Sequence, residues 1–229
     1  MKKSVIVLSI GGSLIIPDKV NTKFLKKFKK IIQKHTKNYK FVIVCGGGSF
    51  ARKYINSLSE IGANYKTQCL AGIAVTRTNA RFLSYFFNKD SEKGIPHKIH
   101  EIKKILKKQD IVFCGGLEYK PNQTSDGTAA EISSKFKAVF INLTNVSGLH
   151  DKNPKKYKNA KLISKISWKK FNKMANKINY KPGQHFILDQ SGAGIILKNK
   201  IKTYILGPNL KNLDNLLKNK KFKGTLIKG

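Results

Sequence analysis

The sequence predicts an α/β protein built around a mostly parallel sheet. Continuous apolar runs rich in Val, Ile and Phe occur at residues 5–10, 41–45, 111–114, 138–143 and 203–206. Runs of this length without polar alternation are typical of strands that are buried on both faces. Segments with helical spacing of apolar residues lie between them, and this alternation favours parallel strands joined by helical crossovers.

The helices are predicted from the periodicity of their apolar residues. In residues 21–34 apolar side chains recur every three or four positions, as on one face of a helix, and Asn21 or Thr22 can cap the start. Further helices are expected at residues 49–61, about 68–87, from 125 or 126 onward, at 167–177 and from 189 to about 198. Long loops are expected at residues 117–124 and 149–160.

The composition limits the class of protein. The chain has 229 residues, of which 40% are hydrophobic; this suits one compact domain or two small lobes and excludes a disordered basic tail. No apolar run approaches the roughly 18 residues of a membrane span, and no signal-peptide pattern opens the chain. The three cysteines, Cys45, Cys69 and Cys114, are an odd number without CxxC spacing, so we expect neither a disulfide framework nor a zinc site. We therefore expect a cytoplasmic protein.

Basic residues greatly outnumber acidic ones: 46 Lys and Arg against 12 Asp and Glu give a formal net charge of +34. Such a charge favours polyanionic partners, which are nucleic acid, a membrane surface or phosphorylated small molecules. The lysines recur along the whole chain, mostly on the polar faces of predicted helices. We therefore favour a Lys-rich solvated surface over a nucleic-acid site, which needs cations concentrated on one face with aromatic side chains between them.

Glycines follow the predicted strands. They occur after the first three strands and close behind the fourth, at residues 11–12, 46–48, 115–116 and 148. Glycine lets backbone N–H groups approach a ligand, and a helix that follows adds its positive end, so such turns bind anions. Because the carboxyl ends of parallel strands are where α/β proteins bind ligands, these turns together predict a phosphate-binding site.

Two common phosphate motifs do not account for these turns. The P-loop pattern GxxxxGK[ST] is absent, since no Gly-Lys pair occurs. Residues 46–51 match GxGxxA, but the acidic residue required about 20 positions later is missing from residues 66–71, which argues against a dinucleotide site. Arg52 lies in the first turn of the helix after these glycines, where a guanidinium can reach a bound phosphate.

Acidic residues are scarce, which makes Asp126 and Asp189 informative. Each lies at the start of a predicted helix and could be a helix N-cap and nothing more. Alternatively, both belong to a phosphoryl-transfer site, where they would orient Mg²⁺, a lysine or the transferred group. The histidines form no catalytic pattern, although His150 lies in the second long loop, a candidate nucleotide loop.

These motifs resemble those of the archaeal-type uridylate (UMP) kinases, a branch of the amino-acid kinase superfamily. The resemblance rests on residues 10–13, 46–55, 72–80, 124–126, 144–148 and 188–189, in the family's order across essentially the whole chain. GGGxxARxYI followed by TRxNA is the more specific part. The resemblance implies a three-layer α/β/α sandwich with a mainly parallel central sheet. It implies a single domain over residues 1–229, with an acceptor lobe of about 1–140 and an ATP lobe of about 141–229.

The resemblance also implies an activity. The family transfers the γ-phosphoryl group of ATP, with Mg²⁺, to UMP to give UDP in pyrimidine nucleotide biosynthesis, and its members usually assemble as hexamers. UMP already carries the accepting phosphate, so catalysis is alignment of two polyanions and charge neutralisation, with little proton abstraction. The mechanism expected is direct in-line transfer without a phosphoenzyme.

The likeness assigns roles to individual residues. The transfer itself would be served by Asp126, Asp189 and Arg52. ATP would be held by Gly12, Ser13, Gly48, Arg52, Thr144, Asn145, His150 and Asn153. UMP would be held by Gly47, Cys69, Leu117, Asn122, Gln123, Thr124 and Ser125. No residue is assigned to a metal.

Some positions on the acceptor side depart from the family's pattern. Cys69 stands where the family usually has an Asp that contacts the nucleoside monophosphate. The loop after Gly116 is slightly longer than usual and has Asn122 where Gly is common. These changes leave open a superfamily kinase that acts on another phosphorylated or carboxylated acceptor.

Other departures lie on the ATP side and at the first glycine turn. Ser147, His150 and Asn153 replace Asp, Tyr and Asp, and Ser9 stands where many members have Lys. They leave open a third function class, a catalytically weak protein that binds nucleotide or polyanion and has kept the fold.

Overall fold

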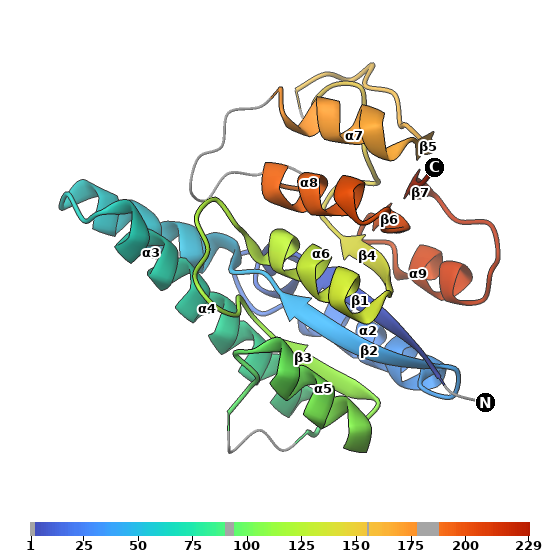
Figure 1. Cartoon of the computed structure of the whole chain (residues 1–229), viewed down its shortest axis with the longest axis horizontal. Coiled ribbons are helices and arrows are strands. Elements are labelled where there is room, and N and C mark those ends of the chain that lie inside the picture. Colours follow the sequence, from blue (N-terminus) through green and yellow to red (C-terminus); the bar gives the residue numbers. More distant parts are fainter. Residues whose placement is uncertain (1–2, 90–93, 155, 178–187) are drawn as a thin grey trace.

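The computed structural model describes residues 3–89, 94–154, 156–177 and 188–229. One sheet runs through this part of the chain (Figure 1), with the strand order β3-β2-β1-β4-β6-β7-β5. The strands are β1 (Ser4–Ile10), β2 (Tyr39–Cys45), β3 (Ile111–Cys114), β4 (Val139–Leu143), β5 (Lys165–Ile166), β6 (Thr203–Leu206) and β7 (Gly224–Ile227). Every strand pair is parallel except β6 with β7, which confirms the predicted mainly parallel sheet.

Helices cover both faces of the sheet. They are α1 (Gly12–Ile15), α2 (Thr22–His35), α3 (Gly48–Glu60), α4 (Tyr65–Phe86), α5 (Ile99–Lys108), α6 (Ser125–Phe136), α7 (Trp168–Ala175), α8 (Gln190–Lys198) and α9 (Leu210–Leu217). One apolar cluster joins α1, α2, α4 and α9 to one face, and a second joins α5, α6, α7 and α8 to the other. The protein is therefore a three-layer α/β/α sandwich, as the resemblance implied.

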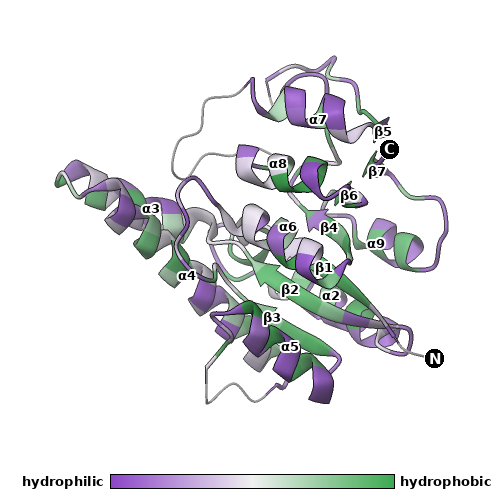
Figure 2. Ribbon diagram, viewed as in Figure 1, coloured by the Kyte–Doolittle hydropathy of each residue, from purple (hydrophilic) through white to green (hydrophobic). Residues whose placement is uncertain are grey.

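The strands are buried on both faces because their apolar runs are unbroken. In β1, Ile6 and Leu8 belong to the cluster beneath α2, whereas Val7 belongs to the cluster beneath α6. Alternate residues of a strand point to opposite faces, so a continuous apolar run supplies both layers of core. Figure 2 shows the result, with hydrophobic strands between helices that turn hydrophilic faces outward.

The predicted helices start and end within a few residues of the observed ones. Asn21 caps α2, with its side chain accepting a hydrogen bond from the backbone N–H of Phe24. Helix α4 starts a turn earlier than predicted because Asn64 caps it and accepts from the N–H of Thr67. Helices α1, α5 and α9 and strands β5 and β7 have no counterpart among the predicted elements.

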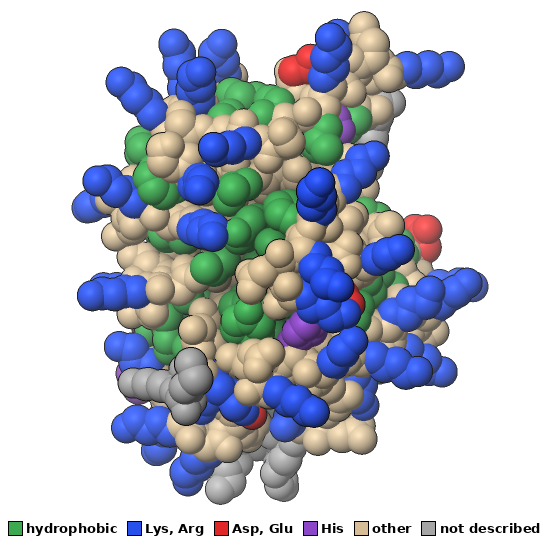
Figure 3. All heavy atoms as spheres, turned by 90° about the vertical axis from the view of Figure 1, so that its right-hand side faces the viewer, with side chains coloured by type: hydrophobic (Ala, Val, Ile, Leu, Met, Phe, Trp, Pro, Cys, Tyr) green, Lys and Arg blue, Asp and Glu red, His purple; other side chains and the backbone are tan. Residues whose placement is uncertain are grey.

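The surface is strongly basic, as the composition requires. Figure 3 shows Lys and Arg side chains scattered over the whole of one face, with few acidic side chains between them. The wide distribution agrees with the favoured interpretation of a Lys-rich solvated surface. In the described part of the chain, no helix has the length and apolar character needed to cross a bilayer.

Candidate active site

The carboxyl ends of the parallel strands meet at one edge of the sheet, and backbone hydrogen bonds link the turns that follow them. The N–H of Gly11 donates to the carbonyl of Leu143 (3.0 Å), and that of Gly46 donates to Ile10 (2.9 Å). On the other side of β4, the N–H of Thr144 donates to the carbonyl of Leu206 (2.9 Å). The glycine turns after β1 and β2 and the turn after β4 are therefore neighbours, as predicted.

The first two glycine turns touch each other closely. A Cβ added to Gly12 would lie 2.1 Å from the backbone nitrogen of Gly48, so no side chain fits there. Gly48 has φ of +67°, a left-handed conformation that glycine adopts without strain. The absence of both side chains lets the two turns pack backbone against backbone, with Gly12 buried and Gly48 partly exposed at the carboxyl edge.

Helix α4 holds the glycine turns from the side. The Asn79 side-chain amide donates to the carbonyl of Gly46 (2.8 Å), and Thr76 Oγ1 accepts from the N–H of Gly116 (2.8 Å). Arg77 Nε donates to the carbonyl of Gly116 (3.0 Å). These side chains belong to the TRxNA motif, which the sequence singled out but to which it gave no individual roles.

A cleft of about 160 Å³ opens beside these turns, between α3, α4, α6 and the loop at residues 117–124. Its lining includes five of the residues predicted to hold the acceptor, together with Gly48; these five are Gly47, Cys69, Gln123, Thr124 and Ser125. Burial raises the pKa of the Cys69 thiol, against a lowering hydrogen bond with Tyr65, so the thiol is neutral at physiological pH.

Two residues predicted on the acceptor side do not line this cleft. Leu117 is buried in the core beneath α6, and its carbonyl accepts a hydrogen bond from Arg77. Asn122 is exposed and has φ of +57°, which explains why glycine is common at this position in the family. Its side-chain oxygen accepts from the hydroxyl of Tyr65 (2.9 Å).

The Asp126 carboxyl group is hydrogen-bonded by two neutral side chains near the ends of β1 and β4. The hydroxyl of Ser9, which is fully buried, donates to Asp126 Oδ1 at 2.5 Å, and Asn142 also hydrogen-bonds the carboxyl group. Burial and the nearby charge of Asp189 raise the pKa of Asp126 to about 7, although the two hydrogen bonds act in the opposite direction. Asp126 is not the N-cap of α6, because Thr124 fills that position.

Asp189 joins the N-termini of two helices. As the N-cap of α8 its Oδ1 accepts from the N–H of Gly192, so the N-cap interpretation is confirmed. Its Oδ2 accepts from the N–H groups of Thr124 (3.2 Å) and Gly127 (3.2 Å) and from the Thr124 hydroxyl. Both oxygens are thus used by the protein, and the carboxylate fixes the start of α6 beside the start of α8.

The residues predicted to hold ATP lie in several segments. Thr144 and Asn145 directly follow β4, next to the first glycine turn. His150 is tied within its own loop, since its Nδ1 lies 2.9 Å from the Gly148 carbonyl oxygen and its Nε2 lies 3.4 Å from Ser147 Oγ.

The remaining predicted residues are accessible. The Asn153 carbonyl accepts from the N–H groups of Lys156 and Tyr157 and closes an exposed turn. Ser13 in α1 and Arg52 near the start of α3 are half-buried, and neither lines the cleft.

The carboxylates at this edge fit a metal ion that arrives with a nucleotide. Among the described residues no group of three or more His, Cys, Asp or Glu side chains could hold a metal. Mg²⁺ retains several waters and is usually bound through one or two carboxylates together with substrate phosphates. Asp126 and Asp189 are the carboxylates at this edge, and each already accepts hydrogen bonds from the protein.

Comparison with known proteins places this geometry in a family. The Amino acid kinase family matches residues 4–207. A uridylate kinase from Thermococcus sibiricus is 32% identical over 97% of this chain and 98% of its own length. One from Archaeoglobus fulgidus is 32% identical over 97% of this chain and 99% of its own.

Solved structures agree with the sequence comparison. The crystal structure of the Archaeoglobus fulgidus uridylate kinase superposes with a TM-score of 0.82, covering 97% of this chain and 99% of that one. A UMP kinase from Ureaplasma parvum, 21% identical, shares the fold with a TM-score of 0.79 over the full length of both chains. The protein therefore belongs to the amino acid kinase family.

Proposed function

We propose that the protein is a uridylate kinase, which transfers the γ-phosphoryl group of ATP to the phosphate of UMP and gives UDP and ADP. The observation that carries this proposal is the close contact between the glycine turns after β1 and β2, with Asp126 bonded to Ser9 near the end of β1 and a cleft beside Gly47 and Gly48. Relatives named uridylate kinase match 97% of the chain, which supports UMP as the acceptor.

In this proposal the backbone supplies most of the binding. The N–H groups of Gly12 and Gly48, with Ser13, would hold the phosphates of ATP, and Gly47 would face the phosphate of UMP. Arg52 would offset the negative charge on the transferred group. The UMP phosphate oxygen is already a nucleophile, so the chain needs to align two polyanions rather than to remove a proton.

The donor nucleotide would lie across the carboxyl ends of β4 and β6. Thr144, Asn145, His150 and Asn153 would contact its adenosine part, so residues 141–229 form the ATP lobe and residues 1–140 the acceptor lobe. Mg²⁺ bound with ATP would supply charge neutralisation. Asp189 would act by fixing the starts of α6 and α8 around the site. We propose that the enzyme acts in the cytoplasm as a homo-oligomer.

Purified protein with MgATP and a panel of acceptors tests the proposal. UDP should form rapidly with UMP. If only a different phosphorylated or carboxylated acceptor is phosphorylated, that acceptor and not UMP is the substrate. The absence of any turnover, together with tight RNA binding that weakens steeply with salt, would instead identify a polyanion-binding protein.

Direct in-line transfer has its own test. ATP made chiral at the γ-phosphorus should give UDP with inverted configuration, because a single displacement inverts the phosphorus once. Retention would indicate a phosphoenzyme and two displacements.

A further inference from the structure

The loop at residues 117–124 is anchored to α6 through Glu131. Lys120 Nζ lies 2.5 Å from Glu131 Oε1, and the Gln123 side-chain amide donates to Glu131 Oε2 at 3.1 Å. Burial raises the pKa of Glu131, but the hydrogen bonds from Lys120 and Gln123 outweigh it, so the net shift is downward. Glu131 is therefore ionised at neutral pH and fixes the position of the Lys120 ammonium group.

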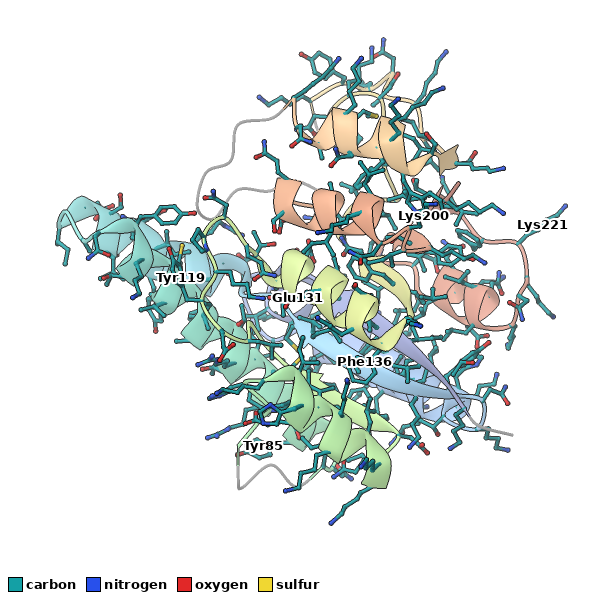
Figure 4. The ribbon with its side chains drawn as sticks, viewed as in Figure 1. Tyr85, Tyr119, Glu131, Phe136, Lys200 and Lys221 are labelled. Carbon is teal, nitrogen blue, oxygen red and sulfur yellow. The ribbon has the colours of Figure 1, made fainter. Side chains whose placement is uncertain are left out.

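The same loop is held on its other side by α4. The hydroxyl of Tyr65 donates to the Asn122 side chain at 2.9 Å, and Lys66 Nζ lies 5.9 Å from the centre of the Tyr119 ring. Figure 4 shows the loop between α4 and α6: Tyr119, a loop residue, lies near α4, and Glu131 lies on α6. The loop thus spans the cleft from α4 to α6, which brings Lys120 into its lining.

Lys120 is the one cation among the described residues that line this cleft. The other ionised residue of the lining, Glu118, is largely exposed and pairs with Lys98 at 3.7 Å. The remaining lining groups are neutral, including the Cys69 thiol, whose pKa is raised by burial. An ammonium group has three donors, so after its contact with Glu131 two remain for an anion in the cleft.

We propose that Lys120 is a specificity-determining residue that selects a phosphorylated acceptor, and that Glu131 is the positioning residue that holds it in the cleft. This inference rests on the proposed function, since it takes the cleft as the acceptor site. A charge-assisted hydrogen bond from the ammonium group to the acceptor's phosphate favours anionic over uncharged acceptors. Glu131 confines a flexible lysine stem before the acceptor arrives, which lowers the entropy cost of binding.

Steady-state kinetics and UMP titration calorimetry on four variants test the inference. Lys120→Gln should raise KM for UMP by about tenfold and leave KM for ATP unchanged, since one charge-assisted hydrogen bond is lost. Lys120→Arg should retain most of the affinity, and Glu131→Gln should give a smaller rise in KM. The matched control is Lys3→Gln, which removes a lysine that also pairs with an acid, Asp110 at 2.6 Å, and neither residue lines the cleft.

The salt dependence gives a readout that a purely structural role would not change. KM for UMP should rise with ionic strength in the wild type and rise less in Lys120→Gln, because one phosphate contact is missing. Unchanged UMP affinity in Lys120→Gln, or the same change in Lys3→Gln, overturns the role of Lys120.

The two proposals fail in distinguishable ways. Wild-type UDP formation with an unchanged KM in Lys120→Gln overturns only the role of Lys120. Calorimetric UMP binding that depends on Lys120, without UDP formation, overturns only the kinase function. No UMP binding by the wild type overturns both.

Discussion

Among the described residues, the Asp126 carboxyl group interacts with Ser9, Asn142 and the carboxylate of Asp189, and none of these is a cation. Ser9 is a polar residue inside an otherwise apolar run, and this was a visible signal in the sequence. Its pairing with Asp126, which is 117 positions away, depends on the packing of α6 against β1 and has no local pattern. The sequence could therefore identify the acid but not its environment.

The raised pKa of Asp126 predicts a pH-dependent stability. The folded-state value of about 7 lies above the roughly 3.9 of an unfolded Asp, so the folded protein holds this proton more tightly. This contribution is fully present below about pH 4 and is lost as pH rises through about 7. Asn at this position stays neutral, so the Tm of Asp126→Asn relative to wild type should increase over that window. A Tm difference that is constant from about pH 4 to about pH 8 would contradict the assignment.

Removal of the proposed transfer residues predicts a large kinetic effect. Arg52→Ala and Asp126→Asn should each lower kcat/KM by roughly 2–4 kcal/mol of transition-state stabilisation. Thermal unfolding of each variant separates a loss of chemistry from a loss of fold. Kinetics equal to wild type in both variants would remove the site assignment.

The glycine turns are the clearest signal in the sequence, and they predict that a side chain at Gly12 disrupts the site. Gly12→Ala should abolish activity and lower stability by about 1–3 kcal/mol or more, because its Cβ would overlap the backbone of Gly48. Gly194→Ala is the matched control: no atom lies within 4 Å of its Cβ in α8, so it should stabilise the fold by about 0.5–1 kcal/mol. Phosphate binding that survives Gly12→Ala would contradict the structure of the turn.

The elements that were not predicted differ in how much signal they carried. Helix α9 has Leu210, Leu213 and Leu217 at helical spacing behind the cap Asn209, so its pattern was readable. Strands β5 and β7 are two and four residues long and are defined by their pairing with distant strands. Gly224, the first residue of β7, is unfavourable in a strand, yet a Cβ there would lie 2.5 Å from the carbonyl oxygen of Ile205, so the close packing requires glycine.

In the site, too, local patterns were predictable and contacts between distant segments were not. Residues in glycine turns and at helix starts were identified because their role is local. The roles of Asn79, Thr76 and Glu131 were not, because their partners are in other elements. The sequence thus predicted which glycine turns meet at the carboxyl edge but not which side chains hold these turns in place.

Helices α3 and α4 extend beyond the sheet (Figure 1). Both carry exposed apolar side chains. Tyr54 on α3 is 55% exposed and Ile61 at its end is 79% exposed, with Phe50 and Leu70 also exposed. Large apolar side chains exposed together on two neighbouring helices are typical of a contact between subunits. The hexamer implied by the family resemblance predicts that a second copy covers this surface.

Light scattering on a double variant tests this assembly. Tyr54→Lys with Ile61→Lys should lower the oligomer mass, because each adds a charge to the contact, while the monomer fold is unaffected. Val20→Lys is a control that changes an exposed apolar residue outside α3 and α4. An unchanged mass in the double variant would place the subunit contact elsewhere.

The proposed function requires two nucleotides to lie end to end over the glycine turns. Calorimetry with a bisubstrate compound, in which uridine and adenosine are joined through a chain of phosphates, measures whether they do. One molecule should bind per chain, more tightly than UMP or ATP alone, and should displace both nucleotides. Binding that displaces only one nucleotide, or is no tighter than the weaker of the two, would contradict it.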